Sequence, residues 1–248
     1  MEIALLAFFA IGYFVLAGAD LGVGMLLPYL GRTPEERGRV LASITPFFLT
    51  NEVWLVTTVG VLIGAFPVLE GELFSGLYLP FLALLLGWIT RDAGIWLRGR
   101  MDRPGWRSLC ERAVVAGSWV AVLSWGFILL GMGDGFTVGL GALVAVPVAV
   151  VLFAAQGLSL AGLRLDGAPL ERARRIAGPL GGRTVYALTS IVMTVACLLA
   201  GARLPLAENL ADPATLALLT PSILVLTPLL VASQVWLWWL FGRAQVRQ

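Results

Sequence analysis

The sequence predicts an all-α membrane protein, a polytopic bundle of about seven transmembrane helices. Of its 248 residues, 59% are hydrophobic and 13% are charged, whereas a typical soluble domain has about 25% charged residues. The apolar residues form long uncharged runs instead of amphipathic stripes, which is typical of helices that cross a bilayer. Spanning β-strands would require short segments of alternating polarity, and the sequence shows no such pattern.

Seven apolar runs approach or exceed the roughly 20 residues that a helix needs to cross the hydrocarbon core. They cover about residues 3–30, 43–67, 73–97, 113–133, 136–163, 184–202 and 216–242. The first run lacks a basic N-terminal region and continues past the small residues of a possible cleavage site, so we interpret it as a retained span. Neither a low-complexity linker nor a repeat divides the chain, which predicts a single transmembrane helical domain over residues 1–248.

Charge alternates along the connections between these runs. All 17 basic residues are arginine, and they concentrate in the first, third and fifth connections and in the tail, whereas the second, fourth and sixth connections are mainly acidic. By the positive-inside rule, the arginine-rich connections face the cytoplasm. We therefore expect the N-terminus outside, the C-terminus in the cytoplasm and an odd number of spans.

The composition also limits the chemistry of the chain. It contains no histidine, which excludes imidazole ligation of haem or metal and histidine-based catalysis by its own side chains. Its two cysteines, Cys110 and Cys197, lie far apart and have no metal-binding spacing. We expect no metal or cofactor held directly by this chain and no nucleic-acid partner.

Few ionisable residues lie within the expected spans, and they are the candidate functional residues. Asp20 and Glu52 lie in the first and second spans, and Arg91 and Asp92 lie near the end of the third. A charge at the centre of a span costs about 2.5–3.5 kcal/mol, so such residues usually face protein or water. Asp20 and Glu52 are expected at similar depth on neighbouring helices, where they would form one polar cluster with Asn51 and share a proton.

Two interpretations of this cluster stay open. Hydrogen bonds between helices would make it structural, and proton conduction or contact with quinone would make it functional. Arg91 and Asp92 project about 100° apart on a helix and are not an ideal pair. The plain interpretation of Arg91 is a cytoplasmic helix end whose side chain reaches toward the interface. Gly18 and Gly22 have the spacing of a close helix contact.

The stretch GADLGVGMLLPYLGRTPEERGRVLASITPFFLTNEVWL, residues 18–55, resembles the start of subunit II of the cytochrome bd-type quinol oxidases. That family reads approximately DGFDLGVGML, then GR, ER and WDGNEVWL. The similarity continues through AFPVLEGELFSGLYLP (65–80) and the Arg91 region, and returns in QGLSLAGLRLDG (156–167). The matching positions taken as structural or family-motif residues are Gly18, Gly22, Gly24, Trp54, Arg91, Arg98, Gln156 and Arg164.

The resemblance implies a subunit of a quinol:O2 oxidoreductase in the bacterial cytoplasmic (inner) membrane. Its haem-bearing partner, subunit I, carries haems b and d, the quinol site and the centre that reduces O2 to water. Subunit II binds no haem, supports its partner and lines a proton path from the cytoplasm, so no catalytic residue is expected in this chain. Small single-span accessory subunits and membrane lipid or quinone are the other partners that the resemblance implies.

The chain also departs from the family pattern. Ala17, Leu49 and Trp96 stand where the family usually has acidic residues, which removes three acids from the expected proton path. The family usually has nine spans, so this chain is expected to be divergent and shortened, without one helical hairpin after its sixth span. Two alternatives therefore remain, namely a proton-coupled transporter and a scaffold subunit of a bd-like complex with a different redox reaction.

Overall fold

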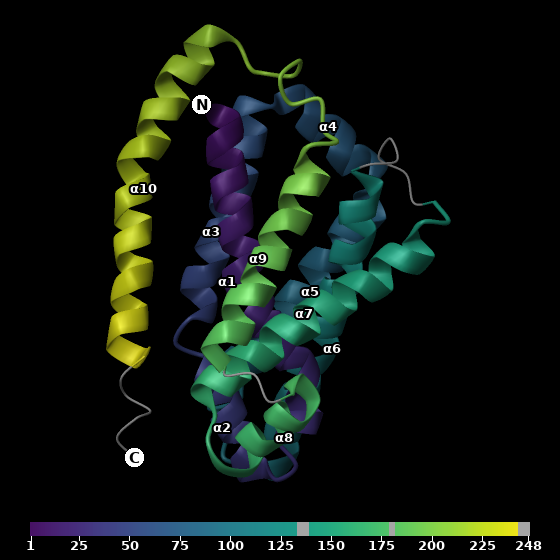
Figure 1. Cartoon of the computed structure of the whole chain (residues 1–248), viewed down its shortest axis with the longest axis vertical. Coiled ribbons are helices and arrows are strands. Elements are labelled where there is room, and N and C mark those ends of the chain that lie inside the picture. The colour runs from purple at the N-terminus through teal and green to yellow at the C-terminus, as the bar shows by residue number, and fades with distance from the viewer. Residues whose placement is uncertain (133–138, 179–181, 243–248) are drawn as a thin grey trace.

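The computed structural model describes residues 1–132, 139–178 and 182–242, which form ten α-helices (Figure 1). The helices are α1 (Glu2–Leu30), α2 (Pro34–Ile44), α3 (Phe48–Ala65), α4 (Pro67–Gly76), α5 (Tyr78–Leu97), α6 (Pro104–Gly131), α7 (Ala142–Arg164), α8 (Gly167–Ala177), α9 (Gly182–Gly201) and α10 (Pro213–Gly242). The long helices run between two ends of a bundle. Helix α4 lies at one end, and α2 and α8 lie at the other (Figure 1).

Within the described residues, six helices are long and apolar enough to cross a membrane on their own, namely α1, α3, α6, α7, α9 and α10. Helices α4 and α5 pass the same criterion only together and are bent by 85° at their break, which brings the number of spans to as many as seven. Both α1 and α10 start at the α4 end and finish at the opposite end (Figure 1). The expected all-α polytopic membrane fold is confirmed.

The structure corrects the boundaries of two expected spans. The run 43–67 is not one helix, because α2 ends at Ile44 and α3 begins at Phe48, on either side of Pro46, which has no N–H to donate and disfavours helix before it. The run 73–97 is divided as well, since α4 ends at Gly76 and the spanning helix α5 begins at Tyr78. The expected start of the fifth span, at residue 136, lies outside the described residues.

Short helices close the end of the bundle opposite α4. The Thr33 hydroxyl accepts from the Glu36 amide at 3.2 Å, and the Glu36 carboxylate accepts from the Thr33 amide at 3.3 Å. This reciprocal capping box, together with Pro34 at the first position, starts α2 directly after α1. The pattern TPEE in the sequence is therefore sufficient to explain where α2 begins.

Helix α1 lies at the centre because its glycines let neighbours approach its backbone. A Cβ added at Gly22 would lie 2.0 Å from the Phe153 carbonyl oxygen and 2.8 Å from Gly157, so α1 and α7 touch along their backbones. Gly18 packs against Phe153 and Met193 at ordinary contact distance, and Gly24 faces the Ser118 hydroxyl of α6. This packing agrees with the close helix contact expected of the Gly18–Gly22 spacing.

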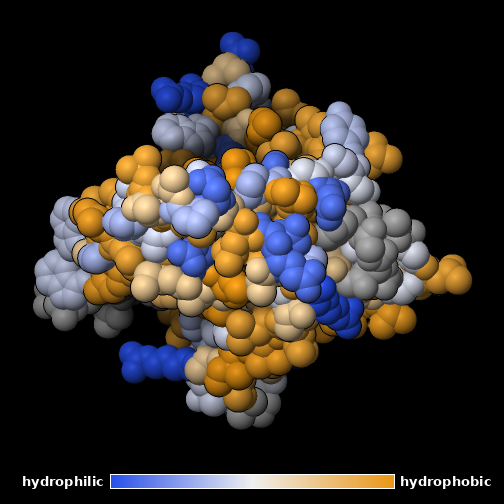
Figure 2. All heavy atoms as spheres, turned by 90° about the horizontal axis from the view of Figure 1, so that it is seen from above, coloured by the Kyte–Doolittle hydropathy of each residue, from blue (hydrophilic) through white to orange (hydrophobic). Residues whose placement is uncertain are grey.

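The outer surface of the bundle is apolar. Helices α9 and α10 are the least covered of the candidate spans, with 6% of their most apolar stretches buried. Large aliphatic side chains point outward from them, and Leu218 and Val225 are each 76% exposed. Seen from the α4 end, hydrophobic side chains cover much of the surface, with hydrophilic ones near the middle and at a few points of the outline (Figure 2). The exposed aliphatic side chains of α9 and α10 suit helices that face hydrocarbon.

Candidate functional site: two buried polar groups

A first buried polar group joins α3 to α5 and consists of Glu52, Arg91 and Asp92, here called the Arg91 group. The Arg91 Nη1 atom lies 3.1 Å from Glu52 Oε1 and 3.0 Å from Asp92 Oδ1, so one guanidinium nitrogen serves two carboxyls. The Arg91 side chain is 2% exposed, and those of Glu52 and Asp92 are 11% and 19% exposed. The Arg91 guanidinium also lies 5.8 Å from the centre of the Phe48 ring. The tip of the arginine is therefore shielded from solvent and lipid.

This geometry differs from what the spacing of Arg91 and Asp92 suggested. Their side chains leave the helix in different directions, but the long arginine side chain reaches back to its neighbour and across to Glu52. Helix α6 leaves little room on its own side, because a Cβ at Gly117 would lie 2.5 Å from the Arg91 backbone nitrogen. Arg91 is thus a buried ion-pair partner and not a side chain that reaches toward the interface.

The charges of the Arg91 group do not balance when both carboxyls are ionised, because one arginine faces two acids. Arg91 Nε and Nη2 make no hydrogen bond within the described residues, so Nη1 alone contacts the two carboxyls. A buried surplus charge is costly, and a proton on either carboxyl removes it. The group can therefore take up one proton and release it again, which is the chemistry that the arrangement offers.

A second buried polar group joins α1, α3 and α10 and consists of Asp20, Asn51, Trp54 and Gln234, here called the Asp20 group. Asn51 Nδ2 donates to Asp20 Oδ2 at 2.6 Å, and Gln234 Nε2 donates to Asn51 Oδ1 at 2.9 Å. Trp54 Nε1 donates to Gln234 Oε1 at 3.3 Å. All four residues are buried. The donors follow one another in a single direction, and the series ends on the Asp20 carboxyl.

The expected single cluster of Asp20, Asn51 and Glu52 is divided between these two groups. Asn51 contacts Asp20, whereas its neighbour Glu52 turns to Arg91 on a different helix. Adjacent residues of a helix point about 100° apart, so two of them rarely serve the same site. The hydrogen bonds of the described residues therefore give Asp20 and Glu52 separate partners.

Two buried polar residues of the bundle, Gln234 and Glu111, were not predicted from the sequence. Gln234 lies in the last apolar run, in the segment SQVW, and a carboxamide in a span is a signal that could have found it. Glu111 was placed in a connection because the expected span began at 113, yet it is buried in α6. It binds Arg37 at 2.7 Å and Arg98 at 2.9 Å, so Arg98 helps to tie α2, α5 and α6 together.

The remaining motif residues make contacts between helices. Gln156 donates to the Val15 carbonyl at 3.0 Å and to Ser190 at 3.1 Å, which links α7 to α1 and α9. The Arg164 guanidinium lies 3.9 Å from the centre of the Phe47 ring and 4.7 Å from that of Trp238. These stacking contacts place its charge between α7, the start of α3 and the end of α10.

The three positions that lack the family's acids lie in two kinds of surroundings. Ala17 is buried in the core, with 3% exposure, whereas Leu49 is 48% exposed and Trp96 is 53% exposed. Trp96 packs edge-on against Phe48, with ring centres 6.5 Å apart. Two of the three positions are therefore on the surface of this chain.

Long apolar helices that bury arginine–carboxyl contacts between them define a multi-pass membrane protein with internal charge. Residues 1–207 match the family model of cytochrome bd terminal oxidase subunit II, and the chain belongs to this family. Within the residues that the structure describes, no group of three or more His, Cys, Asp or Glu residues is placed to hold a metal ion.

Two curated relatives illustrate the similarity. The chain is 38% identical over 114 residues to cytochrome bd ubiquinol oxidase subunit 2 of Bacillus subtilis (strain 168), which covers 46% of this chain and 34% of the relative. It is 36% identical over 113 residues to cytochrome bd-I ubiquinol oxidase subunit 2 of Escherichia coli (strain K12), which covers 46% of this chain and 30% of the relative. The match thus spans about a third of the length of these relatives.

Proposed function

We propose that this chain is the haem-free subunit of a membrane complex that oxidises quinol and reduces O2 to water. Membership of the subunit II family is the observation that carries the proposal. The chain has no histidine, so it cannot supply an imidazole ligand to a haem. We therefore assign haems b and d and the quinol chemistry to a partner, subunit I, and assign to this chain the support of that partner in the bacterial cytoplasmic membrane.

The proposed orientation places the α2 and α8 end of the bundle in the cytoplasm. Arginines gather there, and three of their ion pairs join different helices, namely Arg37–Glu111, Arg39–Asp166 and Arg172–Glu36. An excess of arginine in short connections marks the cytoplasmic side. With this orientation the N-terminus faces outward, as the charge pattern of the sequence predicts.

We assign different roles to the two buried polar groups. The amides of Asn51 and Gln234 are poor proton carriers, so the Asp20 group acts as a lock that holds α10 against α3 and α1. The Arg91 group has a surplus carboxyl, and it is the part of this chain suited to transient proton uptake. A contribution to proton delivery therefore rests on Glu52 and Asp92 more than on Asp20.

A second candidate function is that of a scaffold subunit in a bd-like complex with a different redox reaction. The observation that favours it is the loss of acids at Ala17, Leu49 and Trp96. With these positions apolar, the chain lacks the acidic residues that were expected to carry protons from the cytoplasm to the Arg91 group. In this case the Arg91 group would be structural, and the complex would assemble without taking protons through this chain.

Glu52→Gln and Glu52→Leu distinguish the two functions in the complex purified from its membrane. Oxygen uptake with quinol and the reduced-minus-oxidised haem spectrum are measured on the same preparation. Its polypeptide composition also shows whether a single-span accessory subunit is present. If Glu52 delivers protons, Glu52→Gln keeps the haem spectrum and slows oxygen uptake, because the amide preserves shape but does not titrate. Full turnover in Glu52→Gln with failed assembly in Glu52→Leu supports a structural role of Glu52 within the oxidase, whereas a haem-containing complex that takes up no oxygen with quinol supports the scaffold with a different redox reaction. Absence of haem from every preparation, including the unaltered protein, contradicts the oxidase proposal.

A further inference from the structure

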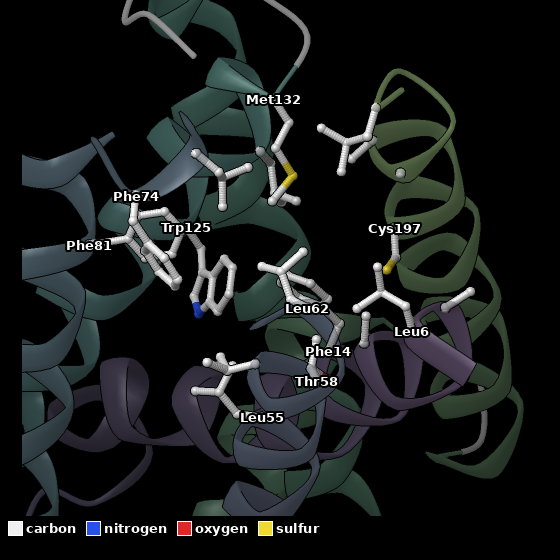
Figure 3. A pocket seen from close by; sticks show the side chains of 18 of the residues that line it. Leu6, Phe14, Leu55, Thr58, Leu62, Phe74, Phe81, Trp125, Met132 and Cys197 are labelled. Carbon is white, nitrogen blue, oxygen red and sulfur yellow. The ribbon is translucent and has the colours of Figure 1, made fainter. Parts of the chain in front are cut away.

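A large cavity lies between α1, α3, α5, α6 and α9, in the half of the bundle toward α4 (Figure 3). Its volume is about 920 Å³, which is in the range of sites that hold a whole ligand. Phe74 and Phe81 line one side and Cys197 lines another, with Trp125 between them (Figure 3). The cavity is separate in its chemistry from the two polar groups, because its walls are mostly aliphatic and aromatic.

Two of the polar side chains in the walls, Thr58 and Trp125, already have hydrogen-bond partners. The Thr58 hydroxyl donates to the Trp54 carbonyl oxygen of its own helix at 2.7 Å. The Trp125 indole nitrogen donates to the Tyr13 hydroxyl at 3.2 Å. An apolar cavity does not hold water stably, and these walls leave few groups to bind the carbonyls of a polar ring. The walls therefore select a long hydrocarbon chain.

The cavity is continuous with the surface that faces lipid. Leu82 and Leu85 of α5 and Leu198 of α9 line it, and they are 39%, 48% and 48% exposed. A hydrocarbon chain in the bilayer can thus enter between α5 and α9 without crossing a polar barrier. Helix α9 has little other cover, so a chain in this position would add to the packing that holds α9 in the bundle.

A charged residue stands at the α4 end of the cavity. The segment that follows α9 contributes Ala202, Leu204 and Leu206 to the walls, and the exposed Arg203 lies within it. Arg203 is the one basic residue in the connections that we expect on the outer side, where Glu208 and Asp212 are its acidic neighbours in sequence. Asp212 already caps α10 through bonds to Ala214 and Thr215. An arginine beside an apolar cavity suits an anionic headgroup joined to an acyl chain.

We propose that this cavity is a binding site for one phospholipid of the leaflet at the α4 end. An acyl chain fills the space between α5 and α9, and the phosphate lies near Arg203. The bound lipid acts as a structural part of the bundle, and its main effect is to hold α9 against α1 and α6. This inference does not depend on the redox reaction of the complex.

Two matched glycine variants test the proposal. A Cβ at Gly201, which lines the cavity, meets nothing within 4 Å, and the same holds for Gly60 on the exposed side of α3. Gly201→Leu therefore puts a side chain into the cavity without displacing protein, whereas Gly60→Leu adds the same side chain outside it. Both variants replace glycine by leucine, at the last residue of α9 and within α3, so they add the same side-chain volume.

The probe is phosphatidylglycerol with a photoreactive diazirine near the end of one acyl chain, applied to the complex in nanodiscs. Labelled peptides are identified by mass spectrometry, and unlabelled phosphatidylglycerol and a long-tailed quinone are added as competitors. We expect label on the peptide with Cys197, reduced about tenfold or more in Gly201→Leu, because each methylene displaced from an apolar site weakens binding several-fold. Gly60→Leu should label like the unaltered protein, and Arg203→Gln should label less.

Three results would overturn the proposal. One is equal labelling in Gly201→Leu and Gly60→Leu, which would place the probe on the outer surface only. Another is competition by the quinone at lower concentration than by the phospholipid, which would make the occupant a quinone. The third applies if Gly201→Leu does not assemble. The unaltered protein is then labelled in the presence of excess unlabelled phosphatidylglycerol, and a signal that does not fall would show that no saturable site exists.

Discussion

Replacing Arg91 by methionine tests whether the Arg91 group holds α3 to α5. The substitution keeps an unbranched side chain of similar length but removes the cation that lies 3.1 Å from Glu52 and 3.0 Å from Asp92. Both carboxyls would then be buried without a positive partner. Removing one member of a buried ion pair typically costs about 3–5 kcal/mol, because the partner charge is left uncompensated.

Glu52→Gln is the matched change on the other side of the contact. Arg91 keeps its ion pair with Asp92, and the amide oxygen of glutamine still accepts from Arg91 Nη1. One charge-assisted hydrogen bond then becomes a neutral one, which should lower the free energy of unfolding by about 0.5–1.5 kcal/mol. The structure therefore predicts a marked asymmetry between two variants of the same contact.

The assay is thermal unfolding of the purified protein in detergent, followed by the loss of the monodisperse peak in size-exclusion chromatography. For a chain of this size, 1 kcal/mol shifts Tm by about 2–4 °C. Arg91→Met should thus lower Tm by about 6–20 °C, and Glu52→Gln by about 1–6 °C. In the double variant, the surplus of negative charge is smaller, so part of the loss should be recovered, by about 1–2 kcal/mol.

Strict additivity of the two changes, or a Tm for Arg91→Met within about 2 °C of the unaltered protein, would contradict a role of Arg91 in holding α3 to α5. Either result would mean that Arg91 and Glu52 do not share their stabilisation energy. The same would follow if Glu52→Gln were as damaging as Arg91→Met, since the removal of one acid leaves the charges of the group balanced.

Three further predictions concern the rest of the fold. Gly22→Leu should prevent assembly because its Cβ would lie 2.0 Å from a backbone oxygen of α7, whereas Gly60→Ala should raise Tm slightly, as judged by thermal unfolding. Gln234→Leu should cost about 1–3 kcal/mol by leaving Asn51 without its donor, and faster hydrogen exchange in α10 would show it. Backbone amides at residues 32 and 33 lower the pKa of Glu36 below its ordinary 4.5, so its stabilisation is present above that pH and is lost as pH falls through the lowered pKa. Glu36→Gln should therefore flatten the acid limb of a Tm-against-pH profile, and an unchanged limb would contradict this prediction.

Much of the fold could be predicted from the distribution of apolar residues along the chain. Hydropathy is a property of consecutive residues, so the apolar runs predicted the crossing helices, whereas the helix that begins after Thr33 was not predicted. The boundaries at Pro46 and at the break before Tyr78 were harder to place. A proline near the end of an apolar run marks a helix boundary in one context and is tolerated within a helix in another, as Pro228 shows in α10.

Residue types and the lengths of the apolar runs are enough to predict a membrane bundle with a few costly polar residues inside it, because insertion energy depends on residue type and span length. Which of these polar residues meet depends on how the helices pack. Asn51 pairs with Gln234, which is 183 positions away, while adjacent Glu52 pairs with Arg91 on α5. These partners depend on how closely helices approach, and contacts such as that of Gly22 with α7 set that approach. Pairing between distant helices leaves no local pattern in the sequence, so the division into two polar groups emerged only when the helices were packed.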